Sequence, residues 1–267
     1  MKIELRLGTP ADYRAVEEVT REAFWINTDC RPYIDEHLLA HKLRQTSAFV
    51  PELDYVAEVQ GNIVGSIVYS KAKIVESPGK EHQVLTFGPL SVLPQFQNKG
   101  IGKMLVDVTT AKARELGYTA IVIFGHPDYY PRLGFRPAAE FGLETSGGRT
   151  FPAFMAMELK QGALQGMQGQ FHEDAVFGSL QKEEVLAFDQ GFPQKAPRPK
   201  IPMEVLLARL EPKARESLQR FRLTYLGEMR RVSEGEVSRL PGLDGKALET
   251  IRSTMKEHGR TWGAPTE

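Results

Sequence analysis

The sequence predicts an α/β fold with a mixed central sheet, followed by a small all-α domain. The first observation is a loop with two glycines, Gln97-Asn98-Lys99-Gly100-Ile101-Gly102, which lies between a strand-like run and a helix-like run. The second is the run from Ala120 to Phe124, which is apolar at every position, as a parallel strand covered on both faces must be. The third is the last part of the chain, where apolar residues recur at helical spacing after a proline-rich stretch.

Length and composition set the limits of this interpretation. With 267 residues the chain is long enough for two domains, each with a buried core. The 34 basic and 34 acidic side chains cancel, so the overall charge favours neither nucleic acid nor a membrane surface as a partner. The single cysteine, Cys30, cannot form an internal disulfide, and no apolar run reaches the ~18 residues of a membrane span. Residues 1–7 lack the apolar core of a secretion signal, so we expect a cytoplasmic protein with no membrane partner.

The N-terminal part is expected to run in the order strand, helix, helix, strand, strand. Ile3, Leu5 and Leu7 share one face of the first strand, and Pro10 is typical of the first turn of a helix. Gln60-Gly61-Asn62 predicts the turn of a hairpin. The five elements are expected at residues 3–7, 10–24, 34–43, 53–59 and 63–70.

Two histidines in the second predicted helix raise the question of a metal. His37 and His41 are four residues apart and therefore share one helix face, as a metal pair would require. The sequence around them is not the zincin pattern, and no third ligand is evident. We therefore predict no metal and expect a structural or substrate-side role for both.

The glycine loop has the composition of a phosphate-binding turn. Glycine has no Cβ, so consecutive N–H groups at the start of the following helix can approach a pyrophosphate. A Walker loop would need glycine at Gln97 and serine or threonine at Met104, and a dinucleotide fingerprint would need a third glycine at Leu105. Neither pattern fits. A turn that needs glycine only for its backbone angles remains the alternative.

The loop joins two predicted strands through a helix. Residues 84–90 form a central strand whose end is disturbed by Gly88 and Pro89, since proline cannot donate a ladder hydrogen bond. Residues 101–116 have helical spacing, and residues 120–124 form the next strand. Together they predict one right-handed parallel crossover.

Polar residues follow that last strand, where open α/β sheets place their ligands. His126, in Gly125-His126-Pro127-Asp128, could accept a proton from an ammonium substrate, and the alternative is a hydrogen-bonded scaffold residue. A late strand is expected near residues 151–159, and its Glu158 is a candidate carboxylate on the acceptor side or a solvated strand end.

Three segments carry a resemblance to a known family. Leu90-Ser91-Val92-Leu93-Pro94, Gln97-x-x-Gly-x-Gly and Tyr129-Tyr130-Pro131-Arg132-Leu133-Gly134-Phe135 stand in the order and at the distances of the GNAT superfamily of acyl-CoA-dependent N-acyltransferases, which residues 1–160 resemble. The resemblance implies a sheet with splayed parallel strands and a disturbed central strand.

The same resemblance implies roles for individual residues. Acetyl-CoA would bind as a co-substrate, without a metal, and an amine acceptor would attack its thioester directly. The residues implied in CoA binding are Leu90, Val92, Gln97, Asn98, Lys99, Gly100, Ile101, Gly102 and Lys103. The main chains of Leu90 and Val92 would meet the thioester carbonyl and the pantetheine arm. Tyr130 would protonate the departing thiolate, and its alternative is a packed tyrosine with a hydrogen-bonded hydroxyl.

The remainder of the chain is expected to form an extension, a linker and a second domain. Residues 161–202 contain recurring glycines and prolines, with a short appended piece at 183–189 and a semi-rigid linker at 190–202. Residues 203–267 are predicted to be a small helical bundle. The residues expected to point inward are Leu206, Leu207, Leu210, Leu248, Ile251 and Met255.

The helical part carries a second resemblance. Residues 213–218, 226–229 and 240–248 together resemble the C-terminal domain of the bacterial RNA polymerase α subunit, a helix-hairpin-helix type module, which implies a bacterial protein. Where that family grips DNA, this chain has Lys213, Glu216 and Asp244, with Lys246 retained. Two carboxylates oppose phosphate binding, and 13 basic against 10 acidic residues from 200 onward are a small excess. We therefore expect this domain to contact protein and not DNA.

The sequence thus predicts an acyl-CoA-dependent N-acyltransferase, most simply an N-acetyltransferase, that acts on a small-molecule or protein amine. Two alternatives stay open. One is a transcription- or DNA-associated regulator whose acyltransferase half senses CoA or modifies a bound partner, and the other is an inactive scaffold. No charge cluster selects an aminoglycoside, a polyamine or a protein lysine, so the acceptor is left open.

Overall fold

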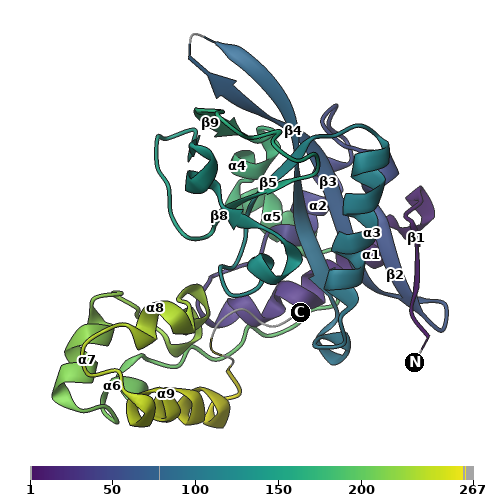
Figure 1. The fold of residues 1–267 in the computed structure, drawn as a ribbon. Coiled ribbons are helices and arrows are strands. Elements are labelled where there is room, and N and C mark those ends of the chain that lie inside the picture. Colours follow the sequence, from purple (N-terminus) through teal and green to yellow (C-terminus); the bar gives the residue numbers. More distant parts are fainter. Residues whose placement is uncertain (1, 78, 261, 263–267) are drawn as a thin grey trace.

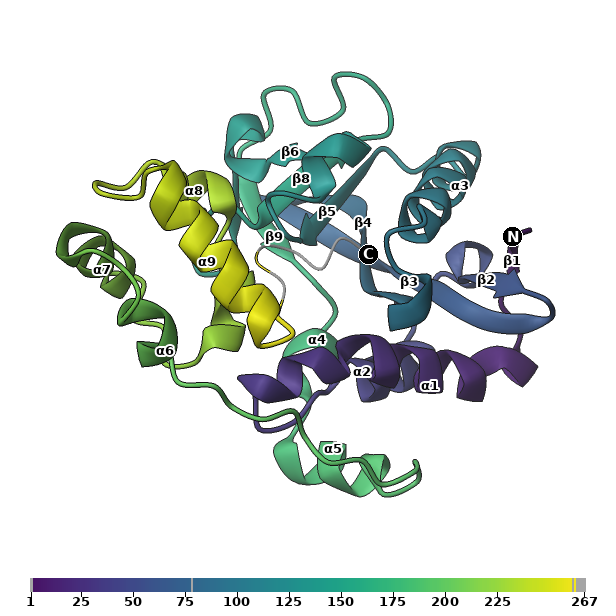
Figure 2. The same ribbon diagram turned by 90° about the horizontal axis from the view of Figure 1, so that it is seen from below.

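A mixed sheet forms the centre of the molecule. The computed structural model describes residues 2–77, 79–260 and 262. Helices α1 (Tyr13–Phe24) and α2 (Glu36–Leu43) cover one face of the sheet, and α3 (Ile101–Glu115) covers the other. A helical module, formed by the described residues from Met203 onward, lies at one end of the molecule (Figures 1 and 2). The predicted α/β class with a mixed central sheet is confirmed.

Within the described residues, nine strands form one sheet in the order β1-β2-β3-β4-β5-β8-β6, with β9 paired to β3 and β7. The pairs β4–β5 and β7–β9 are parallel, and the other pairs are antiparallel. The strands are β1 Glu4–Leu7, β2 Tyr55–Val59, β3 Asn62–Glu76, β4 Lys80–Val92, β5 Ala120–Phe124, β6 Arg136–Pro137, β7 Leu143–Thr145, β8 Phe154–Glu158 and β9 Gly169–His172. The predicted strand, helix and strand at β4, α3 and β5 are therefore present, and β4 and β5 are parallel as expected.

The two parallel strands at the centre separate toward their carboxyl ends. β4 and β5 pair at one position, Leu85 with Ile121. The pairing of β3 with β4 shifts register between Ile67 and Tyr69, opposite Gly88-Pro89, where β4 contains one extra residue. This β-bulge is the expected disturbance of the strand. Beyond it the two strands leave a space at the edge where parallel sheets bind ligands.

Helix α3 begins from a left-handed turn. Gly100 has φ +78° and is the residue before the helix, a backbone conformation that glycine adopts without strain. The buried side of α3 packs on the sheet, with Ile101 and Leu105 in one apolar core with Tyr69 and Ile121. The loop between strand and helix thus has the geometry that its glycines predicted.

The sheet continues into the segment expected to be an extension. β9 lies beyond residue 160 and pairs with β3, Ile74 opposite Phe171. A Cβ at Gly169 would lie 2.7 Å from the Ile74 side chain, so the close approach of the two strands requires glycine there. β3 and β4 are also longer than the strands predicted at residues 63–70 and 84–90, and they pair with each other from Glu76 opposite Lys80 onward.

The two histidines of α2 contact aromatic rings and a carboxylate of the fold. His37 is fully buried, its ring 5.4 Å from that of Phe188 and 5.1 Å from that of Phe192, and burial lowers its pKa to about 4. His41 Nδ1 lies 2.8 Å from Glu17 Oε1. Helix α5 (Lys182–Asp189), which supplies Phe188, matches the predicted short piece. In the described part of the chain, no group of three or more His, Cys, Asp or Glu residues is placed to hold a metal ion.

The helical module has a core of its own. It contains the short helices α6 (Glu204–Leu207), α7 (Pro212–Gln219), α8 (Glu234–Ser238) and α9 (Gly245–Glu257). Of the residues predicted to point inward, Leu248 is partly buried and the other five are buried. At the start of α9, the Ala247 N–H donates to Oδ1 of Asp244, the residue before the helix, at 2.9 Å. This carboxylate therefore caps the helix. Among the described helices of the chain, none combines the length and apolar character needed to cross a membrane.

A buried ionic cluster joins the module to the 3-10 helix Trp25–Asp29, which follows α1. Asp29 is fully buried and receives both terminal nitrogens of Arg230, at 2.6 and 2.9 Å. Arg260 Nε lies 2.6 Å from Asp29 Oδ2. Burial alone would raise the pKa of Asp29, but the hydrogen bond and charge of Arg230 outweigh it and hold that pKa below its usual value. A Cβ at Gly227 would lie 2.4 Å from Asp29 Oδ1, so the module seats closely on this carboxylate.

Candidate active site

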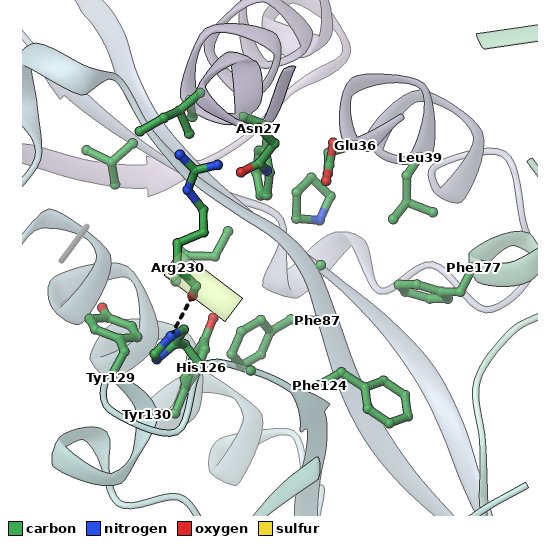
Figure 3. A pocket seen from close by; sticks show the side chains of 18 of the residues that line it. Asn27, Glu36, Leu39, Phe87, Phe124, His126, Tyr129, Tyr130, Phe177 and Arg230 are labelled. Atoms are coloured by element: carbon green, nitrogen blue, oxygen red, sulfur yellow. Dashed lines mark hydrogen bonds between the residues drawn. The ribbon is translucent and has the colours of Figure 1, made fainter. Parts of the chain in front are cut away.

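A cavity of about 560 Å³ opens where β4 and β5 separate. Figure 3 shows His126, Tyr130 and Phe87 gathered at one side of it, and Glu36, Leu39 and Phe177 at the other. The lining residues come from the ends of α1 and α2, the bulged part of β4, the segment after β5, the chain after β9, and the module. They are Ala23, Phe24, Ile26, Asn27, Glu36, Leu39, Phe87, Gly88, Pro89, Leu90, Val92, Gln97, Phe124, Gly125, His126, Tyr129, Tyr130, Glu173, Phe177 and Arg230.

The main chain of β4 faces the cavity after the bulge. The Leu93 N–H donates to Val64 O at 2.8 Å, so the polar main-chain groups of Leu93 point toward β3. Because these groups alternate along an antiparallel strand, those of Leu90 and Val92 point the other way, into the space that β5 has left. Val92 O accepts a hydrogen bond from Gln97 Nε2 at 3.1 Å. Both predicted donors are therefore oriented toward the cavity.

The glycine loop lies beside the cavity, at the start of α3. Of its predicted binding residues Gln97 lines the cavity, and the others, Asn98, Lys99, Gly100, Ile101, Gly102 and Lys103, form the turn and the first turn of the helix. Lys99 Nζ donates to Gln95 O at 2.8 Å, and Lys103 Nζ pairs with Asp107 Oδ2 at 2.5 Å. The first turn of α3 contains no acidic residue that would repel an anion.

Tyr130 stands on a short turn between β5 and the next strand. Residues Tyr130–Leu133 form a short 3-10 helix, and Pro131 is near its start, where its missing N–H is tolerated. The Tyr130 ring packs 5.5 Å from that of Phe135 and 5.9 Å from that of Phe87. A Cβ at Gly125 would lie 2.2 Å from this ring, so glycine at the end of β5 makes room for the tyrosine. These contacts fix the ring at the cavity.

Both ring nitrogens of His126 are engaged. The Asp128 N–H donates to Nδ1 at 3.2 Å, which assigns the ring hydrogen to Nε2. Nε2 then donates to the main-chain oxygen of Arg230 at 2.9 Å, the dashed line in Figure 3. Burial lowers the pKa of His126, which keeps the ring neutral. The histidine thus connects the end of β5 to the module, and it would accept a further proton only after one of these bonds opens.

The cavity contains two carboxylates that sequence reasoning missed. Glu36 lies at the start of α2, where its Oε1 accepts from Arg31 Nη1 at 2.6 Å and its Oε2 accepts from the Asp35 N–H at 3.1 Å. Glu173 follows β9 and lines the cavity, and no described residue forms a hydrogen bond or ion pair with its carboxylate. Burial raises the pKa of Glu173 to about 7. A carboxylate in a segment rich in glycine and proline gave no sequence signal, because only the pairing of β9 with β3 brings it to the cavity.

Glu158, the candidate carboxylate of the late strand, lies elsewhere. Its Oε2 accepts from the Gly162 N–H at 3.1 Å and its Oε1 from the Leu164 N–H at 2.8 Å. It does not line the cavity. The acceptor-side role considered for Glu158 is therefore wrong, and the residue organises the turn after β8.

Comparison with other proteins assigns the first part of the chain to a known kind of domain. The model of the acetyltransferase (GNAT) domain matches residues 52–137. The chain is 27% identical over 171 residues to the uncharacterized N-acetyltransferase YhbS of Escherichia coli K12, a match that covers 63% of this chain and 96% of YhbS. It is 30% identical over 146 residues to the uncharacterized N-acetyltransferase YjhQ of the same strain, covering 54% of this chain and 71% of YjhQ.

Two crystal structures with a bound donor have a similar fold. The complex of E. coli YhbS with CoA superimposes with a TM-score of 0.60 at 26% identity and covers 68% of this chain and 94% of YhbS. A GNAT family acetyltransferase from Brucella melitensis in complex with acetyl-CoA has a TM-score of 0.51 at 27% identity and covers 66% of this chain and 98% of that protein. Both matches leave about a third of this chain without a counterpart.

Proposed function

Since the chain belongs to the GNAT family of N-acetyltransferases, we propose that it moves an acetyl group from acetyl-CoA directly to an amine bound in the cavity. The observation that carries this proposal is the outward-facing main chain of Leu90 and Val92 beside Tyr130, in the space where β4 and β5 separate. Relatives of similar fold bind CoA or acetyl-CoA, which supports the same donor here.

The proposed donor site has two parts. The N–H groups at the start of α3, from Gln97 to Lys103, receive the pyrophosphate, because the amides of a helix N-terminus attract anions. The N–H groups of Leu90 and Val92 hold the pantetheine arm and the thioester carbonyl. The carbonyl then lies at the end of the cavity, where an acceptor from the α1 and α2 side reaches it.

The chemical step needs one proton donor. When the amine forms the new C–N bond and the C–S bond breaks, negative charge develops on sulfur, and the hydroxyl of Tyr130 supplies the proton that this thiolate takes up. His126 is the base that the sequence suggests, and that role requires one of its two hydrogen bonds to open during the cycle.

The helical module serves this site as an interaction module whose partner is its own catalytic half. Arg230 lines the cavity, and the buried Asp29 holds it there. The helix-hairpin-helix resemblance suggests a nucleic-acid partner, but the Asp244 carboxylate occupies the amides of α9 that would receive a phosphate. The DNA-associated alternative is therefore not favoured.

The experiment is a panel of amines screened for CoA release with the intact protein and acetyl-CoA. We expect turnover of at least one amine and release of one CoA for each amide formed. Binding of acetyl-CoA without turnover of any amine would favour the inactive scaffold, and failure to bind acetyl-CoA at all would refute the proposed function.

A further inference from the structure

One carboxylate in the cavity has no hydrogen-bond or ion-pair partner among the residues that the structure describes. The charged groups that line it are Glu36, Glu173, His126 and Arg230. Glu36 is paired with Arg31, and Arg230 is paired with Asp29. His126 is neutral and doubly hydrogen-bonded. Of these four, Glu173 alone forms no hydrogen bond or ion pair with a described residue, and burial is the single influence on its pKa.

The surroundings of Glu173 make this unusual. The neighbouring Asp174 uses its Oδ1 to accept the Val176 N–H at 2.9 Å and so caps α4 (Val176–Ser179). Phe177 of the same helix also lines the cavity. A partly buried carboxylate beside apolar side chains loses hydration without compensation, which is costly unless a cation pairs with it. A cation supplied by a ligand would stabilise the ionised form of this carboxyl group.

Much of the remaining lining is apolar. Phe24, Leu39, Phe87, Phe124 and Phe177 contribute apolar side chains to the same cavity as the two glutamates, and Asn27 and Gln97 contribute amides. A polyamine would place a second and a third ammonium group against these side chains, and an aminoglycoside would place hydroxyl groups there without partners. A monoamine with an apolar body leaves no polar group unpaired.

We propose that Glu173 binds the ammonium group of the acceptor and takes its proton, and that the acceptor is a primary monoamine with a compact apolar body. This inference rests on the proposed acetyl transfer. It adds the general base of the reaction and the class of amine that accepts the acetyl group. The raised pKa of Glu173 fits the task, since a base acts best when its pKa lies near the working pH.

Every proton transfer in this reaction can be assigned to the amine, Glu173, Tyr130 or solvent. The ammonium gives one proton to the Glu173 carboxylate, and the freed lone pair forms the C–N bond as the C–S bond breaks. Tyr130 gives its proton to the thiolate and recovers one from the nitrogen that becomes the amide. Glu173 returns its proton to solvent, so one amine cation and one acetyl-CoA yield one amide, one CoA thiol and one proton.

The test compares two acceptors in wild type and in Glu173→Gln. 2-Phenylethylamine is an ammonium ion at neutral pH, and aniline is already neutral and needs no base. We expect the variant to lose at least about 100-fold in kcat/KM with 2-phenylethylamine and less than about 5-fold with aniline, with unchanged acetyl-CoA affinity. We also expect the acidic limb near pH 7 in the wild-type kcat/KM profile to disappear.

Two further variants keep the test decisive. Glu173→Asp retains a carboxylate and should keep an acidic limb at a lower rate. Glu183→Gln changes an exposed glutamate of α5 and should behave as wild type. The Tm of Glu173→Gln at pH 8 should equal or exceed that of wild type. The reason is that a folded-state pKa raised above its usual value lowers stability as pH rises through the interval between the two.

These outcomes distinguish a failure of the inference about Glu173 from a failure of the proposed acetyl transfer. Equal losses with both amines, a persisting acidic limb, or a preference for spermidine over 2-phenylethylamine would overturn the inference while acetyl transfer stands. Absence of turnover with every amine in wild type would instead refute the proposed function on which it rests.

Discussion

The two ends of the cavity are built in different ways. The proposed donor end comes from one continuous stretch, in which a bulge at Gly88-Pro89 and a left-handed Gly100 set the course of the main chain. The proposed acceptor end joins α2, the chain after β9 and the module, and an ion pair at this end links residues 201 positions apart. A main-chain site follows local sequence, whereas a side-chain site exists only once distant segments have packed.

The largest expected effect tests whether the acceptor end depends on that packing. Asp29→Asn leaves Arg230 and Arg260 buried without a counter-charge, so we expect the free energy of unfolding to fall by about 3 to 5 kcal/mol. The KM for the amine should rise, with acetyl-CoA affinity held within about twofold. Chemical denaturation and steady-state kinetics measure the two effects.

The control for that variant is Glu18→Gln, which removes an exposed ion pair with Arg14 and should change stability by less than about 1 kcal/mol. An Asp29→Asn protein with wild-type stability would show that this cluster does not hold the module. The acceptor end would then not depend on this contact between distant segments.

The next effect concerns Tyr130, which stands between the two ends. Tyr130→Phe should reduce kcat by about 10- to 1,000-fold and leave acetyl-CoA affinity unchanged, as expected for loss of an acid that acts only in the transition state. Tyr118→Phe, at the opposite end of β5, should have wild-type kcat. If Tyr130→Phe also turned over at the wild-type rate, the tyrosine would be a packing residue alone.

A third variant pair sharpens the description of the donor end. Gly100→Val should weaken acetyl-CoA binding by at least about 2 kcal/mol, measured by calorimetry. A Cβ at Gly100 would meet no atom within 4 Å, so the change does not crowd the free protein. Two causes of weaker binding remain: the positive φ of Gly100, which valine rarely adopts, and a side chain that stands in the way of the ligand. Gly100→Asn tolerates that φ. Should Asn bind acetyl-CoA as wild type does, the glycine serves the turn, and should Asn lose as much as Val, the added side chain blocks the ligand.

The smallest expected effect concerns the outer face of the module. The intact protein should show no binding to duplex DNA tighter than about 10⁻⁶ M at about 150 mM salt, the level that phosphate attraction alone can give. Glu216→Asn with Asp244→Gly should raise that affinity, since it removes two negative charges at a cost of only a few tenths of a kcal/mol for the cap. Tighter binding by the wild type would give the module a second function away from the cavity.

The sequence predicted the parts of the site that depend on the main chain. Gly88 and Pro89 indicated the bulge because their effects on a strand are local. Tyr130 was suggested by the resemblance to the GNAT superfamily, and its role stays a prediction. Glu173 and Glu36 carried no such signal. A glutamate looks alike on a solvated surface and in a cavity, and what distinguishes these two is desolvation by residues far along the chain.

The module illustrates the same limit. Its helices follow from apolar spacing, but nothing local indicates that Arg230 turns inward to Asp29. Likewise β9 was expected to be part of an extension, because its glycines favour turns and its pairing with β3 is a tertiary event. Helix periodicity and turn residues depend on a few neighbouring residues and can be recognised in the sequence. The proposed acceptor end depends on contacts between distant segments and cannot.

The Asp29 cluster also has a consequence for the order of events during protein synthesis. A ribosome makes Arg230 201 residues after Asp29, which at about 5 to 20 residues per second is a delay of about 10 to 40 seconds. The growing chain can complete β4, α3 and β5 within the first half of that interval, while Asp29 remains hydrated. The Asp29–Arg230 ion pair, and with it the contribution of Arg230 to the cavity wall, is therefore among the last contacts that the newly made protein can form.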